Sequence, residues 1–199
     1  MTAPAACLRR VLLVGMMGAG KTTVGRAVAE RLGWTFVDAD EELERQAGRS
    51  IPDLFRTDGE AAFRAEEARV LAEQIARPEP VVLALGGGAV VAEANRAAIA
   101  APGGLVVWLR ADAGILLERL GSGTGRPMLE GDVAARTRAL EAQRRPLYES
   151  LADLVVDAGE LTPTAAADRI VAAVAADPTA HAPGPVTANT GAGASRCTN

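Results

Sequence analysis

The chain has 199 residues, about one domain, and 49% of its residues are hydrophobic although only 3% are aromatic. Its formal net charge of −4 argues against bulk electrostatic binding to nucleic acid or to an anionic membrane surface. The sequence contains neither a signal-peptide core nor an apolar span of 18 residues. We therefore expect a cytoplasmic protein with neither nucleic acid nor membrane among its partners.

Five short apolar runs alternate with stretches of helix-like composition along the chain. Apolar runs without polar alternation are typical of strands that are covered on both faces, as in a parallel sheet. We expect strands at residues 11–14, 35–37, 81–85, 105–109 and 154–156, and helices at 21–32, 60–75, 92–100, 111–120, 134–152 and 163–176. This alternation predicts an α/β fold, an open, doubly wound five-stranded parallel sheet flanked by helices.

Three stretches depart from the alternation. Residues 41–63 insert extra short helical material after the second strand. Residues 121–132 are rich in glycine and contain a single arginine, which predicts a mobile loop. From about residue 177 the chain has no apolar periodicity, so we expect a single domain over residues 1–176 and a disordered tail over 177–199.

A phosphate-binding motif follows the first apolar run, where residues 15–22 read GMMGAGKT. In G-x-x-x-x-G-K-[ST] the backbone N–H groups converge on the β-phosphate, the lysine reaches the β- and γ-oxygens, and the threonine binds Mg²⁺. A chance match in a chain with 21 glycines is the alternative, but the motif lies between a strand-like and a helix-like run, as its mechanism requires. We expect ATP to contact Gly18, Ala19, Gly20, Lys21, Thr22 and Thr23, with Lys21 also acting in catalysis.

Two aspartates, Asp38 and Asp40, follow the second apolar run. Residues two apart on a strand point to the same face, so both carboxylates would project from the carboxyl edge of the sheet, where α/β proteins bind ligands. Asp38 would then bind Mg²⁺ through water, and Asp40 would lie near an acceptor hydroxyl. The alternative is an ordinary acidic helix cap at Asp40. Beside a phosphate loop we favour the functional interpretation.

The third apolar run ends in Gly86, Gly87 and Gly88. In many P-loop NTPases this strand ends in an aspartate associated with Mg²⁺, and its absence here disfavours a regulatory GTPase or a motor ATPase. Three glycines let a bulky group approach the backbone and leave N–H groups to bind it, although a flexible turn would have the same composition.

Three arginines are candidates for binding an anion, since the planar guanidinium suits carboxylate and phosphate oxygens. Arg64 could instead pair with Glu60 and Glu67 at i−4 and i+3 on a helix. Arg144 could equally lie on a solvated helix face. Arg126, in the glycine-rich loop, suits a catalytic lid residue that closes over the transferring phosphate.

Taken in order, these motifs resemble the shikimate kinases. From about residue 11 to residue 163 the resemblance includes the phosphate loop, F-V-D-A-D, GRSIPDLF at 48–55, D-G-E-x-x-F-R-x-x-E, L-G-G-G-A-V, R-P-M-L and R-R-P-L-Y. Gluconate kinases share the loop and the size but lack the D-G-E-x-x-F-R and G-G-G-A-V pair. The resemblance implies a P-loop kinase fold that phosphorylates the 3-hydroxyl of shikimate with ATP and Mg²⁺, a step toward chorismate and the aromatic amino acids.

The resemblance also implies a role for each matching residue. It implies a helical substrate-binding insertion at about residues 41–70 and a lid at about 121–132. In the shikimate kinase pattern, Asp40 contacts the reacting hydroxyl, and Arg64 and Arg144 bind the shikimate carboxylate. Further contacts to shikimate come from the backbone of Gly86, Gly87 and Gly88 and from the apolar walls Phe55 and Phe63, while Glu67 holds Arg64. On the ATP side, Arg126 is the lid arginine and Arg119 stacks on adenine.

The chain departs from the pattern at two places. Ala84 and Leu85 lack the hydroxyl that many relatives carry before the triple glycine, and Leu161 stands where some carry an arginine on the adenine side. Neither change removes a group that transfer requires. We expect a monomer whose partners are ATP and shikimate; a kinase for another hydroxy acid and a non-catalytic ATP sensor are the alternatives.

Overall fold

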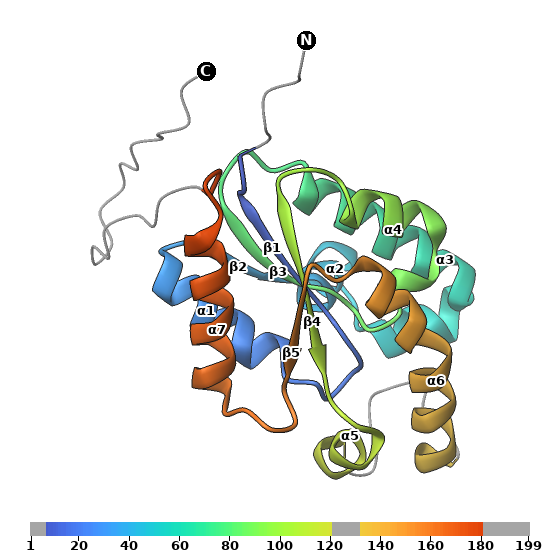
Figure 1. The fold of residues 1–199 in the computed structure, drawn as a ribbon. Helices are drawn as coiled ribbons and strands as arrows, with labels where there is room; N and C mark the ends of the chain where they lie inside the picture. Colours follow the sequence, from blue (N-terminus) through green and yellow to red (C-terminus); the bar gives the residue numbers. More distant parts are fainter. Residues whose placement is uncertain (1–6, 121–131, 181–199) are drawn as a thin grey trace.

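A five-stranded parallel sheet forms the centre of the computed structural model, which describes residues 7–120 and 132–180 (Figure 1). Its strands lie in the order β2-β3-β1-β4-β5, and all four pairings are parallel. They are β1 Arg10–Val14, β2 Thr35–Asp38, β3 Val81–Ala84, β4 Gly104–Arg110 and β5 Leu154–Asp157. The predicted fold class and all five predicted strands are therefore confirmed.

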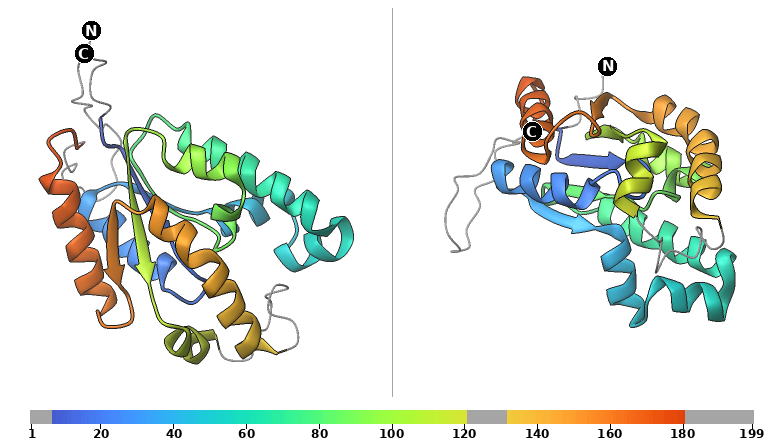
Figure 2. Two further views of the ribbon diagram at one scale, coloured as in Figure 1. Left: turned by 45° about the vertical axis from the view of Figure 1, so that its right-hand side comes forward. Right: turned by 90° about the horizontal axis from the view of Figure 1, so that it is seen from below.

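Helices cover both faces of this sheet (Figures 1 and 2). Helices α1 and α7 lie together on one face, whereas α3, α4 and α6 lie on the other. The helices are α1 Lys21–Leu32, α2 Ala39–Ala47, α3 Ile51–Ile75, α4 Glu93–Ile99, α5 Ala113–Leu120, α6 Val133–Leu151 and α7 Pro163–Ala176, with a 3₁₀ turn η1 at Ala89–Val91.

Strands β1 and β3, inside the sheet, explain why short apolar runs were enough to predict strands. Every residue of β3 is buried, and so are the last four residues of β1. A strand covered on both faces has no solvent side, so it shows a continuous apolar run rather than alternation. Edge strand β2 is only partly buried, and its sequence Thr-Phe-Val-Asp carries a weaker apolar signal.

The insertion after β2 consists of α2 and the first part of α3. Helix α3 consists of two helical parts that meet at Gly59, whose backbone is non-helical with φ 80°. Ser50 caps the first part, which belongs to the predicted extra helical material, and the second part begins at the predicted Glu60. A second apolar cluster joins the two helices, formed by Leu43, Leu54, Phe63 and Val70. This part of the fold therefore has a small core of its own.

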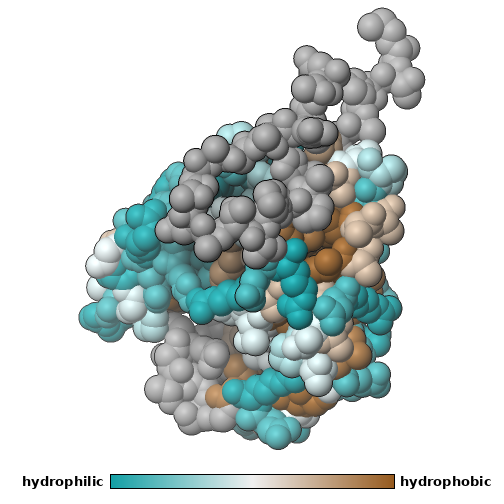
Figure 3. All heavy atoms as spheres, turned by 90° about the vertical axis from the view of Figure 1, so that its left-hand side faces the viewer, coloured by the Kyte–Doolittle hydropathy of each residue, from teal (hydrophilic) through white to brown (hydrophobic). Residues whose placement is uncertain are grey.

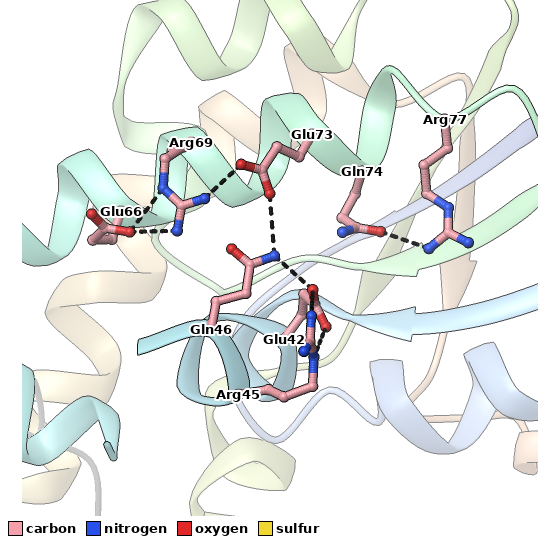
Figure 4. Close-up of polar contacts among 8 residues, drawn as sticks. All are labelled: Glu42, Arg45, Gln46, Glu66, Arg69, Glu73, Gln74 and Arg77. Carbon is pink, nitrogen blue, oxygen red and sulfur yellow. Dashed lines mark hydrogen bonds and ion pairs between the residues drawn. The ribbon is translucent and has the colours of Figure 1, made fainter. Parts of the chain in front are cut away.

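Polar contacts tie the same two helices together on their surface (Figure 4). The Gln46 side chain of α2 donates to Glu42 at 2.6 Å and to Glu73 of α3 at 3.1 Å. Arg69 pairs with both Glu66 and Glu73 along α3. Gln46 is thus the side chain that joins the α2 and α3 parts of this network.

The chain continues in an ordered turn beyond α7. Asp177 accepts hydrogen bonds from the backbone N–H and the hydroxyl of Thr179, and the Leu8 N–H donates to the Thr179 carbonyl at 2.9 Å. Residues 177–180 are therefore ordered, where a disordered tail was expected to begin, and 181–199 lie outside the described residues. Within the described ranges, no helix is long and apolar enough to cross a membrane.

Candidate active site

The phosphate loop connects β1 to α1, as the motif predicts. Its glycines Gly15, Gly18 and Gly20 all have positive φ values, between 83° and 142°, which favour glycine. The Lys21 ammonium donates to the carbonyls of Gly15 and Met16 at 2.9 Å each. The lysine therefore lies over the loop that would surround a phosphate group.

Thr22 and Asp38 lie side by side at the carboxyl edge of the sheet. The Thr22 hydroxyl donates to Asp38 Oδ2 at 2.7 Å. Asp38 Oδ1 accepts the N–H groups of Asp40 and Glu41 at 3.1 and 3.5 Å, so Asp38 caps helix α2. The pair places two oxygen ligands of the kind that Mg²⁺ prefers beside the phosphate loop.

The expected strand geometry of the two aspartates is wrong. Strand β2 ends at Asp38, and Asp40 lies in the first turn of α2 rather than on the strand. The residue that caps the helix is Asp38, not Asp40. The two carboxylates nevertheless line the same cavity, because the cap turns the chain back toward the sheet edge.

This cavity has a volume of about 300 Å³ and brings together most of the predicted phosphate, metal and hydroxyl residues. It is lined by Met17, Gly18, Gly20, Lys21, Thr22, Thr23, Asp38, Asp40, Leu85 and Gly87. It lies where β1, β2 and β3 end, which is the usual place for a ligand in a doubly wound sheet.

Asp40 has the most unusual electrostatic environment in the cavity. Burial and, to a smaller extent, the neighbouring Asp38 raise the pKa of Asp40 to about 6 against the opposing effect of Lys21. Its Oδ1 lies against Gly86, where an added Cβ would be only 2.7 Å away. A carboxyl group with a pKa near neutrality suits exchange of a proton with a bound hydroxyl.

The triple glycine also lies against two arginines from different helices. A Cβ on Gly88 would be 2.5 Å from a guanidinium nitrogen of Arg64, on α3. A Cβ on Gly87 would be 3.6 Å from Nη1 of Arg144, on α6. The structure therefore brings Arg64 and Arg144 to consecutive residues of one glycine segment.

Arg64 and Arg144 differ in how they are satisfied. Arg64 pairs with Glu67 at 2.7 Å and Glu60 at 3.3 Å, as its helical spacing indicated. Arg144 is only 2% exposed, so the alternative of a solvated helix face is wrong. Its Nε and Nη1 are buried without a hydrogen-bond partner among the described residues. Because a buried, unpaired donor is costly, this guanidinium is suited to an anionic ligand.

A second cavity, of about 220 Å³, lies on the other side of the phosphate loop. Arg119 donates to Gly18 O at 3.4 Å and to Ala158 O at 2.9 Å, and so joins the loop to the segment after β5. The lining residues are Ala19, Gly20, Thr23, Val24, Arg119, Ala158, Leu161, Pro163 and Ala166. The cavity therefore contains Leu161, to which the sequence assigned no adenine role.

Several lining residues were missed from the sequence, and one assigned residue cannot be placed. Met17 lies within the phosphate loop and Leu85 directly precedes the triple glycine, so their position in a motif was the only signal for them, and Pro163 had only its place at the start of α7. Arg126 lies outside the described residues. The described ranges contain no group of three or more His, Cys, Asp or Glu side chains that could hold a metal by itself.

Comparison with known proteins gives consistent matches over most of the chain. A family model described as shikimate kinase matches residues 17–175. A shikimate kinase of Thermobifida fusca is 50% identical over 159 residues, which is 80% of this chain and 91% of the relative. One of Ruegeria pomeroyi is 47% identical over 172 residues, covering 86% and 87% of the two chains.

Solved structures agree with these matches. A shikimate kinase from Acinetobacter baumannii in complex with shikimate superposes with a TM-score of 0.81 at 38% identity, over 84% of this chain and 93% of that one. The shikimate kinase from Aquifex aeolicus gives 0.73 at 32% identity, over 83% and 96%. A gluconokinase from Sinorhizobium meliloti, at 20% identity and a TM-score of 0.50, shares the fold alone.

Proposed function

Because the chain belongs to the shikimate kinase family, we propose that it transfers the γ-phosphoryl group of ATP to the 3-hydroxyl of shikimate. The products are shikimate 3-phosphate and ADP, in a step of chorismate and aromatic amino acid biosynthesis. The observation that most supports this assignment is the arrangement around the triple glycine, where a cavity with phosphate-loop and carboxylate groups adjoins buried Arg144, whose Nε and Nη1 have no hydrogen-bond partner among the described residues.

ATP binds, in this proposal, across the two cavities on either side of the phosphate loop. Lys21, which now donates to loop carbonyls, would donate to the β- and γ-phosphate oxygens instead. The base would lie in the second cavity against the guanidinium of Arg119, with Leu161 and Pro163 supplying apolar contact. Phosphate contacts come from Gly18, Ala19, Gly20, Thr22 and Thr23.

The oxygen ligands beside the phosphate loop fit Mg²⁺. Thr22 Oγ1 and Asp38 Oδ2 lie 2.7 Å apart at the cavity, and a site with few protein oxygens suits an ion that keeps several waters and takes phosphate ligands. We assign Thr22 as a direct ligand and Asp38 as a ligand through water. When bound, Mg²⁺ would neutralise charge on the transferring phosphate.

Shikimate occupies the side of the cavity that faces the triple glycine. Arg144 and Arg64 would bind its carboxylate, with Glu67 holding Arg64 through a partly buried ion pair. Its 3-hydroxyl would approach Asp40, whose raised pKa suits it to accept or orient the hydroxyl proton. The Gly86, Gly87 and Gly88 backbone would supply further contacts.

Phe55 and Phe63 are proposed as the apolar walls of the shikimate site. Their ring centroids are 4.6 Å apart, and the Arg64 guanidinium lies 5.0 Å from the centroid of Phe63. The aromatic pair thus packs beside an arginine that we assign to the substrate carboxylate. Arg126, in the segment 121–132, would reach the phosphates as part of a lid.

We further propose that the enzyme is a cytoplasmic monomer. Among the described residues, Val91 is the only large hydrophobic side chain that is exposed. Apolar areas lie between hydrophilic ones on the face that carries α1 and α7 (Figure 3). A stable dimer generally needs a larger apolar surface.

The direct test measures ADP release with ATP, Mg²⁺ and shikimate, with gluconate in a parallel reaction. We expect turnover with shikimate alone, and Asp40→Asn should remove most turnover while leaving the Kd for ATP within about threefold. Turnover only with gluconate would reject the substrate. Tight ATP binding without any turnover would favour an ATP sensor, and an Asp40→Asn enzyme with activity within a few-fold of wild type would reject the role of Asp40.

A further inference from the structure

Tyr148 is a buried tyrosine of α6 that none of the roles above uses. It lies one helical turn after Arg144 and is only 1% exposed. Its hydroxyl donates to the Gly87 carbonyl at 2.6 Å, and its ring stacks on Trp108 of β4 with centroids 6.0 Å apart. Burial raises the pKa of Tyr148 to about 12, against an opposing effect of Arg144, so the hydroxyl keeps its proton and donates it.

Its acceptor, Gly87, lies where the two substrate sites meet. Gly87 lines the phosphate cavity, and a Cβ there would be 3.2 Å from the Met17 nitrogen of the phosphate loop and 3.6 Å from Nη1 of Arg144. A trans peptide is planar, so its C=O and the following N–H point in opposite directions. A bond that fixes the Gly87 carbonyl therefore also fixes the direction of the Gly88 N–H.

The ring and the hydroxyl of Tyr148 make different contacts, so their contributions can be tested separately. The ring alone fills the space between α6 and β4 and stacks on Trp108, so a phenylalanine would retain the packing. Only the hydroxyl reaches the glycine segment. A residue needed for packing alone would not require this bond.

We propose that Tyr148 is a positioning residue for shikimate, whose hydroxyl holds the Gly87–Gly88 peptide in the orientation that receives the cyclic hydroxy acid. This inference rests on the proposed function, because it deepens the account of the same site. Tyr148 itself contacts the glycine backbone, not the reacting atoms. Without its hydroxyl, the peptide could rotate, and the substrate would meet a less ordered wall beside Arg144.

The first test is Tyr148→Phe, which removes the hydroxyl and keeps the ring. We expect the KM for shikimate to rise roughly three- to tenfold, the net effect of one hydrogen bond, while kcat and the KM for ATP stay within about twofold. An unchanged KM for shikimate would overturn the inference. A lower kcat together with higher KM values for both substrates and a lower Tm would also overturn it, because that pattern indicates a structural role.

A matched control comes from the same helix. Thr137 is also fully buried on α6, and its hydroxyl has no hydrogen-bond partner among the described residues. Thr137→Val removes a buried hydroxyl without breaking such a bond. It should leave both KM values within about twofold of wild type, and a rise in the shikimate KM equal to that of Tyr148→Phe would remove the support for a specific role of Tyr148.

A second measurement needs no substitution that could prevent folding. Tyr148 is the only tyrosine of the chain, so biosynthetic incorporation of 3-fluorotyrosine would label this one position. We expect its single ¹⁹F resonance to shift when shikimate saturates the enzyme, and an unmoved resonance would overturn the inference. Absence of wild-type turnover with shikimate would instead reject the proposed function, so the two failures are distinguishable.

Discussion

Replacing Gly86 with alanine would test whether the site carboxylates are held as close to the glycine segment as the structure has them. A Cβ at this position would lie 2.7 Å from Asp40 Oδ1 and 2.9 Å from Glu67 Oε1. An ordinary contact begins near 3.4 Å, so both carboxylates would have to retreat by about 0.5 to 0.7 Å. Both colliding atoms are the ends of side chains, so the two carboxylates can move aside without disrupting the fold. Their positions in the site would nevertheless change.

The size of the effect follows from this displacement. A misplacement of about 1 Å at a reacting centre can cost roughly 100-fold in rate. We therefore expect kcat of Gly86→Ala to fall about 10- to 100-fold, equivalent to about 1.4 to 2.7 kcal/mol of barrier. Overpacking should cost about 1 to 3 kcal/mol of unfolding free energy, which corresponds to a fall in Tm of roughly 2 to 12 °C.

Steady-state ADP release gives kcat, thermal unfolding gives Tm, and titration with ATP by fluorescence or calorimetry gives the Kd for ATP. The Kd for ATP should stay within about threefold, since the nearest contacts of the new methyl group are the two carboxylates. Gly114→Ala on α5 is the control, because its Cβ would meet nothing within 4 Å and alanine suits a helix. Gly86→Ala turnover within threefold of wild type would refute the reasoning.

Three further substitutions test other parts of the molecule. Arg144→Ala should raise the KM for shikimate roughly 10- to 100-fold through loss of charge-assisted hydrogen bonds, and an effect confined to ATP would contradict the carboxylate role. Asp38→Asn retains a good helix cap but weakens the metal site, so half-maximal turnover should need roughly tenfold more Mg²⁺; an unchanged Mg²⁺ titration would argue against the assignment. Gln46→Met removes the hydrogen bond from Gln46 of α2 to Glu73 of α3, and thermal unfolding should show a Tm lower by about 2 to 4 °C, whereas an unchanged Tm would mean that this bond does not contribute to stability.

The strands were predictable because their signal is local. In β1 and β3 the two covered faces require apolar residues at successive positions, and each observed boundary lies within one residue of the predicted one. The packing of α3 was not predictable in the same way. Asp58 and Gly59 have turn composition, and Gly59 does interrupt the helix, so the part that begins at Glu60 was predictable from local sequence. What the sequence did not show is that Leu54 and Phe63, on either side of this break, pack into one cluster with Leu43 of α2. That cluster is a tertiary contact, which no window of sequence contains.

The site divides along the same physical line. The phosphate loop was predictable because its glycines and lysine act within eight consecutive residues. The two aspartates were correctly expected to share a cavity, but both were wrongly expected on the strand, whereas Asp40 lies on α2. Their actual arrangement depends on Asp38 ending the strand and capping α2, a choice between two local hydrogen-bond patterns that the sequence permits equally.

The burial of Arg144 is a property of the packed molecule, and its helix composition alone suits solvent equally well. It becomes informative only through its surroundings: the guanidinium lies beside Gly87, with Nη1 3.6 Å from where a Cβ would be, and two of its buried nitrogens have no partner among the described residues. The adjacent glycines meet different groups, Asp40 at Gly86 and Arg64 at Gly88. Side chains approach Gly86 and Gly88 too closely for a Cβ, and at Gly87 the tightest neighbour is the Met17 nitrogen of the phosphate loop, at 3.2 Å. A composition typical of a flexible turn therefore forms a packed junction between the phosphate loop and the arginines.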